Sequence, residues 1–209
     1  MKTKDTLRKT KKNRKTKTKK TSRVFSNTHY NSTDGMLTTI WGPSMWHYLH
    51  TMSFNYPVEP TMQQKFQYRK FMFEIKNVLP CGKCRTNLVN NFKKHPLQLR
   101  DMKSRETFSR YVYELHELVN TMLDKKSGLS FQDVKERYEH FRARCKLPYN
   151  KNQTRKLQKS GKSVENGCTE PIYGEKSKCI LHIVPAKTKC KTMQIDEQCL
   201  QKRIDNTDI

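Results

Sequence analysis

The sequence contains no run of about 18 apolar residues, the length that a membrane-spanning helix requires, so we expect no transmembrane segment. No apolar stretch follows the basic N-terminus, so we expect no secretory signal peptide either. Acidic residues are few, with 19 Asp and Glu against 43 Lys and Arg, which gives a formal net charge of +24. A surface this basic favours contact with polyanions such as nucleic acid or anionic lipid.

Apolar residues are also scarce, at 33% of the chain, and they are unevenly distributed. They concentrate between about Met36 and Tyr149, so we expect a core only there. This predicts three parts: a disordered basic tail over 1–35, a helical domain over 36–148 and a basic, cysteine-containing extension over 149–209. The tail has 12 basic residues against 2 acidic ones. An arm without a specific partner explains this composition as well as a polyanion-binding segment does.

No alternation of apolar and polar residues is long enough to predict a sheet, whereas helical spacing recurs through the central part. The fold class predicted is all-α, a compact bundle of four to five helices. We expect helices that start near Pro43 and that occupy about 61–78, 81–94, 105–123 and 131–144. The fourth is the clearest, with Ser104 as its cap and an inward face of Phe108, Tyr111, Val112, Leu115, Val119, Met122 and Leu123.

Cys81 and Cys84 are three residues apart at the expected start of the third helix, with Pro80 at its first position. A helix N-terminus lowers the pKa of a cysteine there, so this is a suitable geometry for redox chemistry. Three interpretations compete. A structural zinc site lacks a second CxxC or an HxxxH, and a thioredoxin-like motif lacks the strands around it. The third is a dithiol on a helical bundle that passes electrons to a bound cofactor.

Several aromatic and polar residues suit a planar cofactor held between helices. These residues are Trp46, His50, His116, Asn120 and Tyr138. Each one also has an ordinary explanation, because a tryptophan or tyrosine on an apolar face and a histidine in a core are commonly structural. Lys125, taken by itself, is most simply a solvated charge after the fourth helix. The joint occurrence of these residues with a CxxC is what favours a cofactor site.

Five motifs occur in order: Trp41-Gly-x-x-x-Trp46-x-x-Leu49-His50, Tyr56-Pro57, Cys81-x-x-Cys84, His95-Pro96 and His116-x-x-Val119-Asn120-x-x-Leu123-x-Lys125. Together they resemble the Erv/ALR family of FAD-linked sulfhydryl oxidases, and the branch found in large DNA viruses most of all. The resemblance covers about Trp41 to Arg144. It implies a helical bundle of the Erv/ALR type, usually a homodimer, that binds FAD without a covalent bond.

The resemblance also implies roles for individual residues. Cys84 is the cysteine beside the isoalloxazine, and Cys81 receives incoming thiols. Electrons pass from a substrate dithiol through the Cys81–Cys84 disulfide to FAD and then to O2, which gives H2O2. No metal is implied. The FAD contacts carried over by position are Trp41, Gly42, Trp46, His50, His116, Val119, Asn120, Lys125 and Tyr138.

The chain departs from the family pattern in three places. Tyr113 stands where many relatives have a cysteine, and its usual partner near the start of the fifth helix is absent too. Glu117 replaces a usual asparagine.

A shuttle disulfide such as Cys190 with Cys199 is one interpretation of the extension, and a small stapled segment is the other. The tail cysteines are Cys168, Cys179, Cys190 and Cys199, beside Cys145 at the end of the bundle.

The leading hypothesis is therefore an FAD-dependent thiol oxidase that forms disulfide bonds in substrate proteins. We expect it in the cytoplasm, or in a virion if it is viral. The alternatives are a polyanion-binding protein on a helical scaffold and a zinc-binding adaptor. Both alternatives predict a colourless protein, whereas the oxidase hypothesis predicts a protein with bound flavin.

Overall fold

The structure is a computed structural model that describes residues 25–144, 168, 170–180, 182–185, 187–188 and 194–200. The chain divides into two compact units, 1–34 and 35–209. In the first unit, α1 (Asn27–Tyr30) is a single helical turn capped by Ser26. The predicted disorder of residues 1–24 lies outside the described residues.

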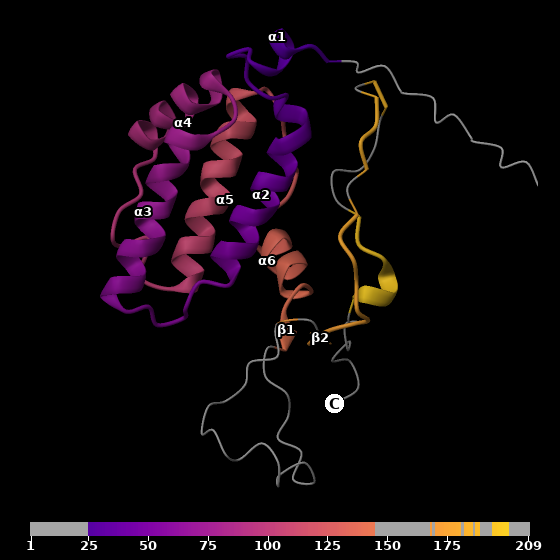
Figure 1. Cartoon of the computed structure of the whole chain (residues 1–209). Coiled ribbons are helices and arrows are strands. Elements are labelled where there is room, and N and C mark those ends of the chain that lie inside the picture. Colours follow the sequence, from indigo (N-terminus) through magenta and orange to yellow (C-terminus); the bar gives the residue numbers. More distant parts are fainter. Residues whose placement is uncertain are drawn as a thin grey trace, which may run out of the picture. The chain divides into compact units, whose positions relative to one another are not determined.

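The second unit contains the bundle, which consists of α2 (Thr38–Phe54), α3 (Met62–Val78), α4 (Gly82–Lys94), α5 (Arg105–Met122) and α6 (Phe131–Glu139). α2 packs on α5 and α6, α3 packs on α4, and α5 also contacts α4 and α6 (Figure 1). Among the described residues, the one strand pair is a two-residue antiparallel ladder of β1 (Ala143–Arg144) and β2 (Glu170–Pro171). η2 (Glu197–Cys199) is a single 3-10 turn. The predicted all-α class is confirmed.

Polar caps fix where three of these helices begin. Thr61, Ser104 and Ser130 each accept a hydrogen bond from the third helical N–H, and the side chain at that third position bonds back to the cap. These boundaries agree with those predicted from the sequence. The caps also remove unsatisfied backbone donors, which stabilises each helix start by about 1 kcal/mol.

Two predicted boundaries are wrong. α2 begins at Thr38, five residues before Pro43, which lies inside the helix. Pro43 is the sixth residue of α2, so it removes one helical hydrogen bond and crowds the carbonyl of residue 39, and the helix continues through it. α6 ends at Glu139 instead of Arg144, because residues 143–144 leave the helix and pair with 170–171.

The core is built by the inward faces of α2 to α5. Phe108, Tyr111, Val112 and Leu115 are buried as predicted. The prediction for the end of that face is wrong, since Met122 is 41% and Leu123 49% exposed. α5 ends at Met122, so its last turn extends beyond the residues that pack most closely. The larger of two buried clusters is Leu49, Tyr56, Met72, Ile75, Leu79, Phe92, Leu97, Met102, Phe108, Tyr111, Val112 and Leu115.

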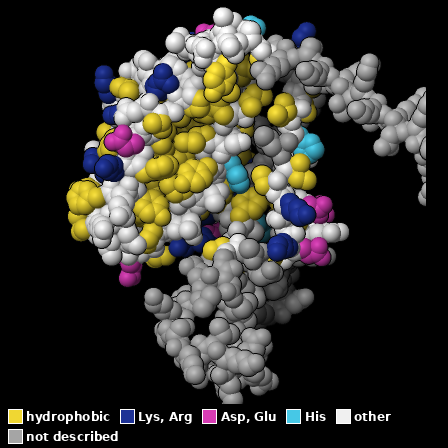
Figure 2. Space-filling view, viewed as in Figure 1, with side chains coloured by type: hydrophobic (Ala, Val, Ile, Leu, Met, Phe, Trp, Pro, Cys, Tyr) yellow, Lys and Arg dark blue, Asp and Glu magenta, His cyan; other side chains and the backbone are white. Residues whose placement is uncertain are grey.

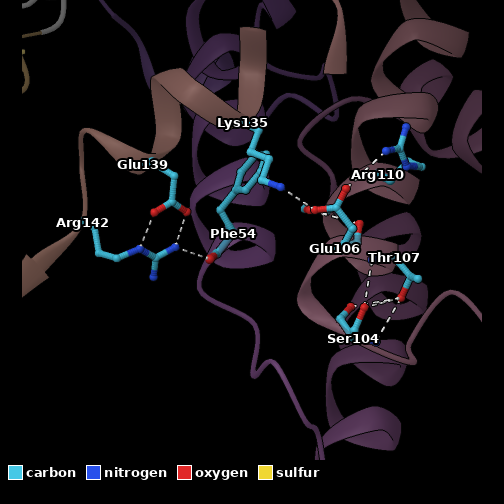
Figure 3. Close-up of polar contacts among 9 residues, drawn as sticks. Phe54, Ser104, Glu106, Thr107, Arg110, Lys135, Glu139 and Arg142 are labelled. Atoms are coloured by element: carbon cyan, nitrogen blue, oxygen red, sulfur yellow. Dashed lines mark hydrogen bonds and ion pairs between the residues drawn. The ribbon is translucent and has the colours of Figure 1, made fainter. Parts of the chain in front are cut away.

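Ion pairs attach α6 to its neighbours. Arg142 bonds both carboxylate oxygens of Glu139, at 2.6 and 2.8 Å, and donates a further bond of 2.9 Å to the carbonyl oxygen of Phe54 (Figure 3). Lys135 of α6 pairs with Glu106 of α5 at 2.8 Å. Phe131, Val134 and Tyr138 pack with Phe54 in a second apolar cluster. α6 is thereby fixed beside the end of α2, which places Tyr138 near the histidines described below.

The described part of the extension adds little regular structure. No described residue of the apolar run 178–184 is in a strand, and Ile180 and Ile183 are exposed. Cys168 is disulfide-bonded, whereas Cys179 and Cys199 are free thiols. A disulfide between Cys190 and Cys199, one of the two interpretations of the extension, is not formed, because Cys199 is free. Cys190 and Cys145 lie outside the described residues. Within the described ranges, no helix is long and apolar enough to cross a membrane.

Candidate active site

The dithiol lies at the N-terminus of α4. Cys81 is the N-cap, in an extended conformation, and its Sγ accepts a hydrogen bond of 3.3 Å from the backbone N–H of Cys84. Pro80 therefore precedes the cap, so its predicted place at the first helical position is wrong. Because the Cys81 sulfur itself acts as the capping acceptor, the helix starts at Gly82, two residues later than a proline at the first helical position would require. The two sulfurs face one another across the first turn.

Hydrogen bonding and burial act differently on the two thiols, which are both free. The side chain and then the backbone N–H of Cys84 donate to Cys81 and hold the pKa of Cys81 below its usual value. Burial raises the pKa of Cys84, and the hydrogen bond with Cys81 adds to this. Of the two thiols, Cys81 therefore loses its proton more readily, as expected for a cysteine at a helix N-terminus.

A cluster of rings forms where α2, α5 and α6 meet. Trp46 and His116 stack with centroids 4.0 Å apart and planes 7° from parallel. His50 Nε2 lies 3.0 Å from His116 Nδ1, within hydrogen-bond distance. The Tyr138 ring lies 5.3 Å from that of His50. Four residues singled out in the sequence, from three separate helices, are therefore brought together.

Burial keeps the two central histidines neutral. It lowers the pKa of His50 to about 3, with smaller contributions from His116 and His47, and that of His116 to about 4. Among the described residues, Nδ1 of His50 is a buried nitrogen without a hydrogen-bond partner. Such an atom costs about 1–3 kcal/mol, so it is typical of a site that a ligand completes.

His47 belongs to the same cluster, although the sequence interpretation passed over it. Its Nδ1 lies 3.2 Å from the Tyr138 hydroxyl. A signal was present, because His47 and His50 are three apart and hence on neighbouring positions of one helix face. It was missed because a partner 91 residues away cannot be read from local spacing.

The remaining residues predicted to contact FAD have other surroundings. Trp41 donates from Nε1 to the Met36 carbonyl oxygen at 3.1 Å, and Asn120 donates to Glu117 at 2.9 Å. Lys125 is exposed beyond the end of α5. Gly42 is buried in α2, and Val119 is half-buried on α5. None of the contacts described for these five residues reaches the ring cluster, so their predicted roles stay predictions.

One hydrophobic core links the dithiol to the rings. Cys84 and Trp46 both pack against it, together with Trp41 and Leu88. The described residues hold no group of three or more His, Cys, Asp or Glu side chains that is able to bind a metal ion. Fold and site together define a helical-bundle protein with a dithiol at a helix N-terminus and a cluster of flat rings on the same core.

Comparison with known proteins supports the resemblance. Residues 43–139 match the model of the Erv1 / Alr family, which confirms the resemblance seen in the motifs. A probable FAD-linked sulfhydryl oxidase of Acanthamoeba polyphaga mimivirus is 36% identical over 86 residues, which are 41% of this chain and 60% of that protein.

Two further relatives come from other sources. The FAD-linked sulfhydryl oxidase of African swine fever virus is 29% identical over 99 residues, 47% of this chain and 80% of that one. The Arabidopsis thaliana FAD-linked sulfhydryl oxidase ERV1 is 32% identical over 84 residues, 40% of this chain and 42% of that one. The crystal structure of the yeast Erv1 core aligns over 58% of this chain and 95% of that chain, with 26% identity and a TM-score of 0.45. The chain thus spans 60% of the mimivirus protein and 42% of the plant protein.

Proposed function

We propose that the chain is an FAD-dependent thiol oxidase that forms disulfide bonds in substrate proteins, with O2 as the final acceptor and H2O2 as product. The observation that carries this proposal is the Cys81–Cys84 dithiol at the α4 N-terminus on the same core as the ring cluster, within the segment that matches the family model. Relatives described as FAD-linked sulfhydryl oxidases support it.

The ring cluster suits FAD for reasons of shape and polarity. Trp46 and His116 offer flat faces for stacking against a planar ring system. The unpartnered Nδ1 of His50 offers one hydrogen bond to a ring edge, and a neutral imidazole does so without a buried charge. FAD, when bound, supplies the two-electron acceptor and passes the electrons to oxygen. We propose that these residues and Tyr138 hold it, together with Trp41, Gly42, Val119, Asn120 and Lys125.

The chain's own chemistry in this proposal is thiol–disulfide exchange. A substrate thiolate attacks Sγ of Cys81 in the oxidised pair, so a mixed disulfide forms and Cys84 leaves as a thiolate. The second substrate thiol then attacks the substrate sulfur of the mixed disulfide and releases Cys81. Cys84, which packs against the core and is raised in pKa by burial, is the flavin-side sulfur.

We propose a homodimer whose interface uses the outer face of α2 and α3. Apolar side chains gather on one face of the molecule in Figure 2, and large ones on α2 and α3 are exposed. Tyr48 of α2 and Phe71 of α3 are in edge-to-face contact, with ring centroids 6.1 Å apart. Their side chains are nevertheless 53% and 37% exposed. Exposed apolar surface of this kind commonly marks an interface.

Three further parts of the proposal lie beyond the bundle. The domain division at 1–35, 36–148 and 149–209 stands as predicted from composition. The basic tail contacts a polyanion, and the cysteines of the extension act as a shuttle or as a staple. The protein works in the cytoplasm, or in a virion if it is viral, where dithiol proteins are its substrates.

The direct test is oxygen consumption by the purified full chain with a small dithiol. We expect uptake that depends on the dithiol, with hydrogen peroxide formed in equal amount. Cys84→Ser should abolish it, because no Cys81–Cys84 disulfide can form, and Cys179→Ser, at an exposed free thiol, is the matched control. Full turnover by Cys84→Ser would refute the assigned role of the pair.

A further inference from the structure

Residues 35–38 lie beside the dithiol, and we call them the strap. The Met36 N–H donates to the Pro80 carbonyl oxygen at 2.7 Å. A Cβ added to Gly35 would lie 2.8 Å from that oxygen, closer than real Cβ atoms come, and 3.1 Å from Cys81 Cα, which is a tight contact. The strap therefore lies directly against residues 80–81, and at position 35 only a glycine fits this approach.

The strap ends at Thr38, whose hydroxyl reaches the inner sulfur. Thr38 Oγ1 lies 3.5 Å from Cys84 Sγ, a hydrogen-bond distance for sulfur. Thr38 is the first residue of α2, and Cys84 is the third of α4, so the hydroxyl comes from a different helix, 46 residues away. Residues in the first turn of both helices, where the partial charge is positive, therefore meet at this sulfur.

Opening the disulfide places a negative charge on Cys84 while Cys81 is bonded to the substrate. Once Cys81 is bonded to a substrate sulfur, its thiol no longer interacts with Cys84. Burial then opposes the charge, and what favours it is the Thr38 hydroxyl with the backbone N–H of Cys84. Of the neighbouring cations, the Arg85 guanidinium donates to the Leu79 carbonyl oxygen, and Lys83 is exposed to solvent.

We propose that Thr38 is a positioning residue that donates a hydrogen bond to Cys84 Sγ and so stabilises the thiolate that leaves when a substrate thiolate opens the Cys81–Cys84 disulfide. In this step the bond between Cys81 and the substrate sulfur forms and the Cys81–Cys84 bond breaks. The electron pair of the broken bond stays on Cys84, so charge is conserved and no further oxidant is needed. The inference rests on the proposed function, because the hydrogen bond assists turnover only if the chain is a thiol oxidase. The test below does not depend on that activity.

The test isolates Cys84 in the full-length Cys81→Ser protein without added flavin, where serine replaces one capping side chain by another. The rate of alkylation of Cys84 by iodoacetamide is followed against pH and assigned by peptide mass spectrometry, which separates Cys84 from Cys179 and Cys199. We expect Thr38→Val to slow the reaction near neutral pH by about three- to tenfold, the effect of one hydrogen bond. The pH midpoint should rise.

Two matched variants decide whether the hydroxyl or the packing is responsible. Thr38→Ser keeps the hydroxyl and should react within about twofold of the parent. Gly35→Ala forces the strap away from Pro80 and should shift the midpoint in the same direction as Thr38→Val. Equal rates in Thr38→Val and the parent would overturn the proposal, and so would equal slowing in Thr38→Ser and Thr38→Val. Absence of flavin from the protein would instead count against the oxidase assignment, which this assay does not use.

Discussion

At the scale of single residues, the neutral histidines of the ring cluster make stability depend on pH. The pKa of His50 lies at about 3 and that of His116 at about 4 in the folded chain, against 6.5 for an unperturbed histidine. Below about pH 6.5 the unfolded chain takes up protons that the folded chain does not, so acid favours unfolding. The loss should begin near pH 6.5 and continue towards the folded pKa values.

We therefore expect the free energy of unfolding of the flavin-free chain to fall by about 1 kcal/mol per pH unit for each of the two histidines as the pH drops from about 6.5 to 5. Urea unfolding at several pH values measures this slope. His50→Gln should reduce it, whereas His182→Gln, at an exposed position, should leave it unchanged. A slope near zero over this interval in the parent chain would mean that the buried histidines do not remain neutral.

The sequence predicted Trp46, His50, His116 and Tyr138 as site residues, and the structure gathers all four. It could not reveal Thr38, because a hydroxyl on one helix and a sulfur on another meet only after the chain has folded. Local spacing shows which residues share a helix face. It does not show which faces meet.

At the scale of helices, starts were easier to predict than ends. Ser104 and Ser130 mark the starts of α5 and α6, because each capping motif lies within four consecutive residues and can be recognised in the sequence. The end of α6 depends instead on a pairing between residues 143–144 and 170–171, which are distant in sequence. The early start of α2 at Thr38 has no side-chain cap to mark it, since Leu37 makes no such hydrogen bond.

The outer face of α2 and α3 gives a prediction at this scale. Phe71→Lys should convert a homodimer to a monomer, because a lysine replaces an apolar ring at the proposed interface and would have to lose its hydration there. Sedimentation equilibrium of the purified chain measures the change. Leu99→Lys is the control, since Leu99 is 45% exposed between α4 and α5 and should have no effect. A parent chain that is already monomeric at micromolar concentration, or an unchanged Phe71→Lys dimer, would exclude this interface.

At the scale of the whole molecule, an all-α class and a CxxC at a helix start followed from composition and periodicity, because helical spacing is strong through residues 36–144. The extension after residue 149 was harder to predict, since its apolar residues are few and follow no helical or strand period. Its cysteines also cannot be paired from sequence alone, because several pairings satisfy the same spacing. Cys168 is bonded and Cys179 and Cys199 are free in the described part.

The central claim is that the bundle holds a flavin within electron-transfer reach of Cys84. The visible absorption spectrum of the purified full-length chain, recorded without oxygen before and after addition of a dithiol, tests it most directly. The account predicts a stoichiometric oxidised-flavin band that bleaches in the parent chain and persists in Cys84→Ser. A chain that stays colourless after reconstitution with FAD, or a band that bleaches equally in Cys84→Ser, would contradict it.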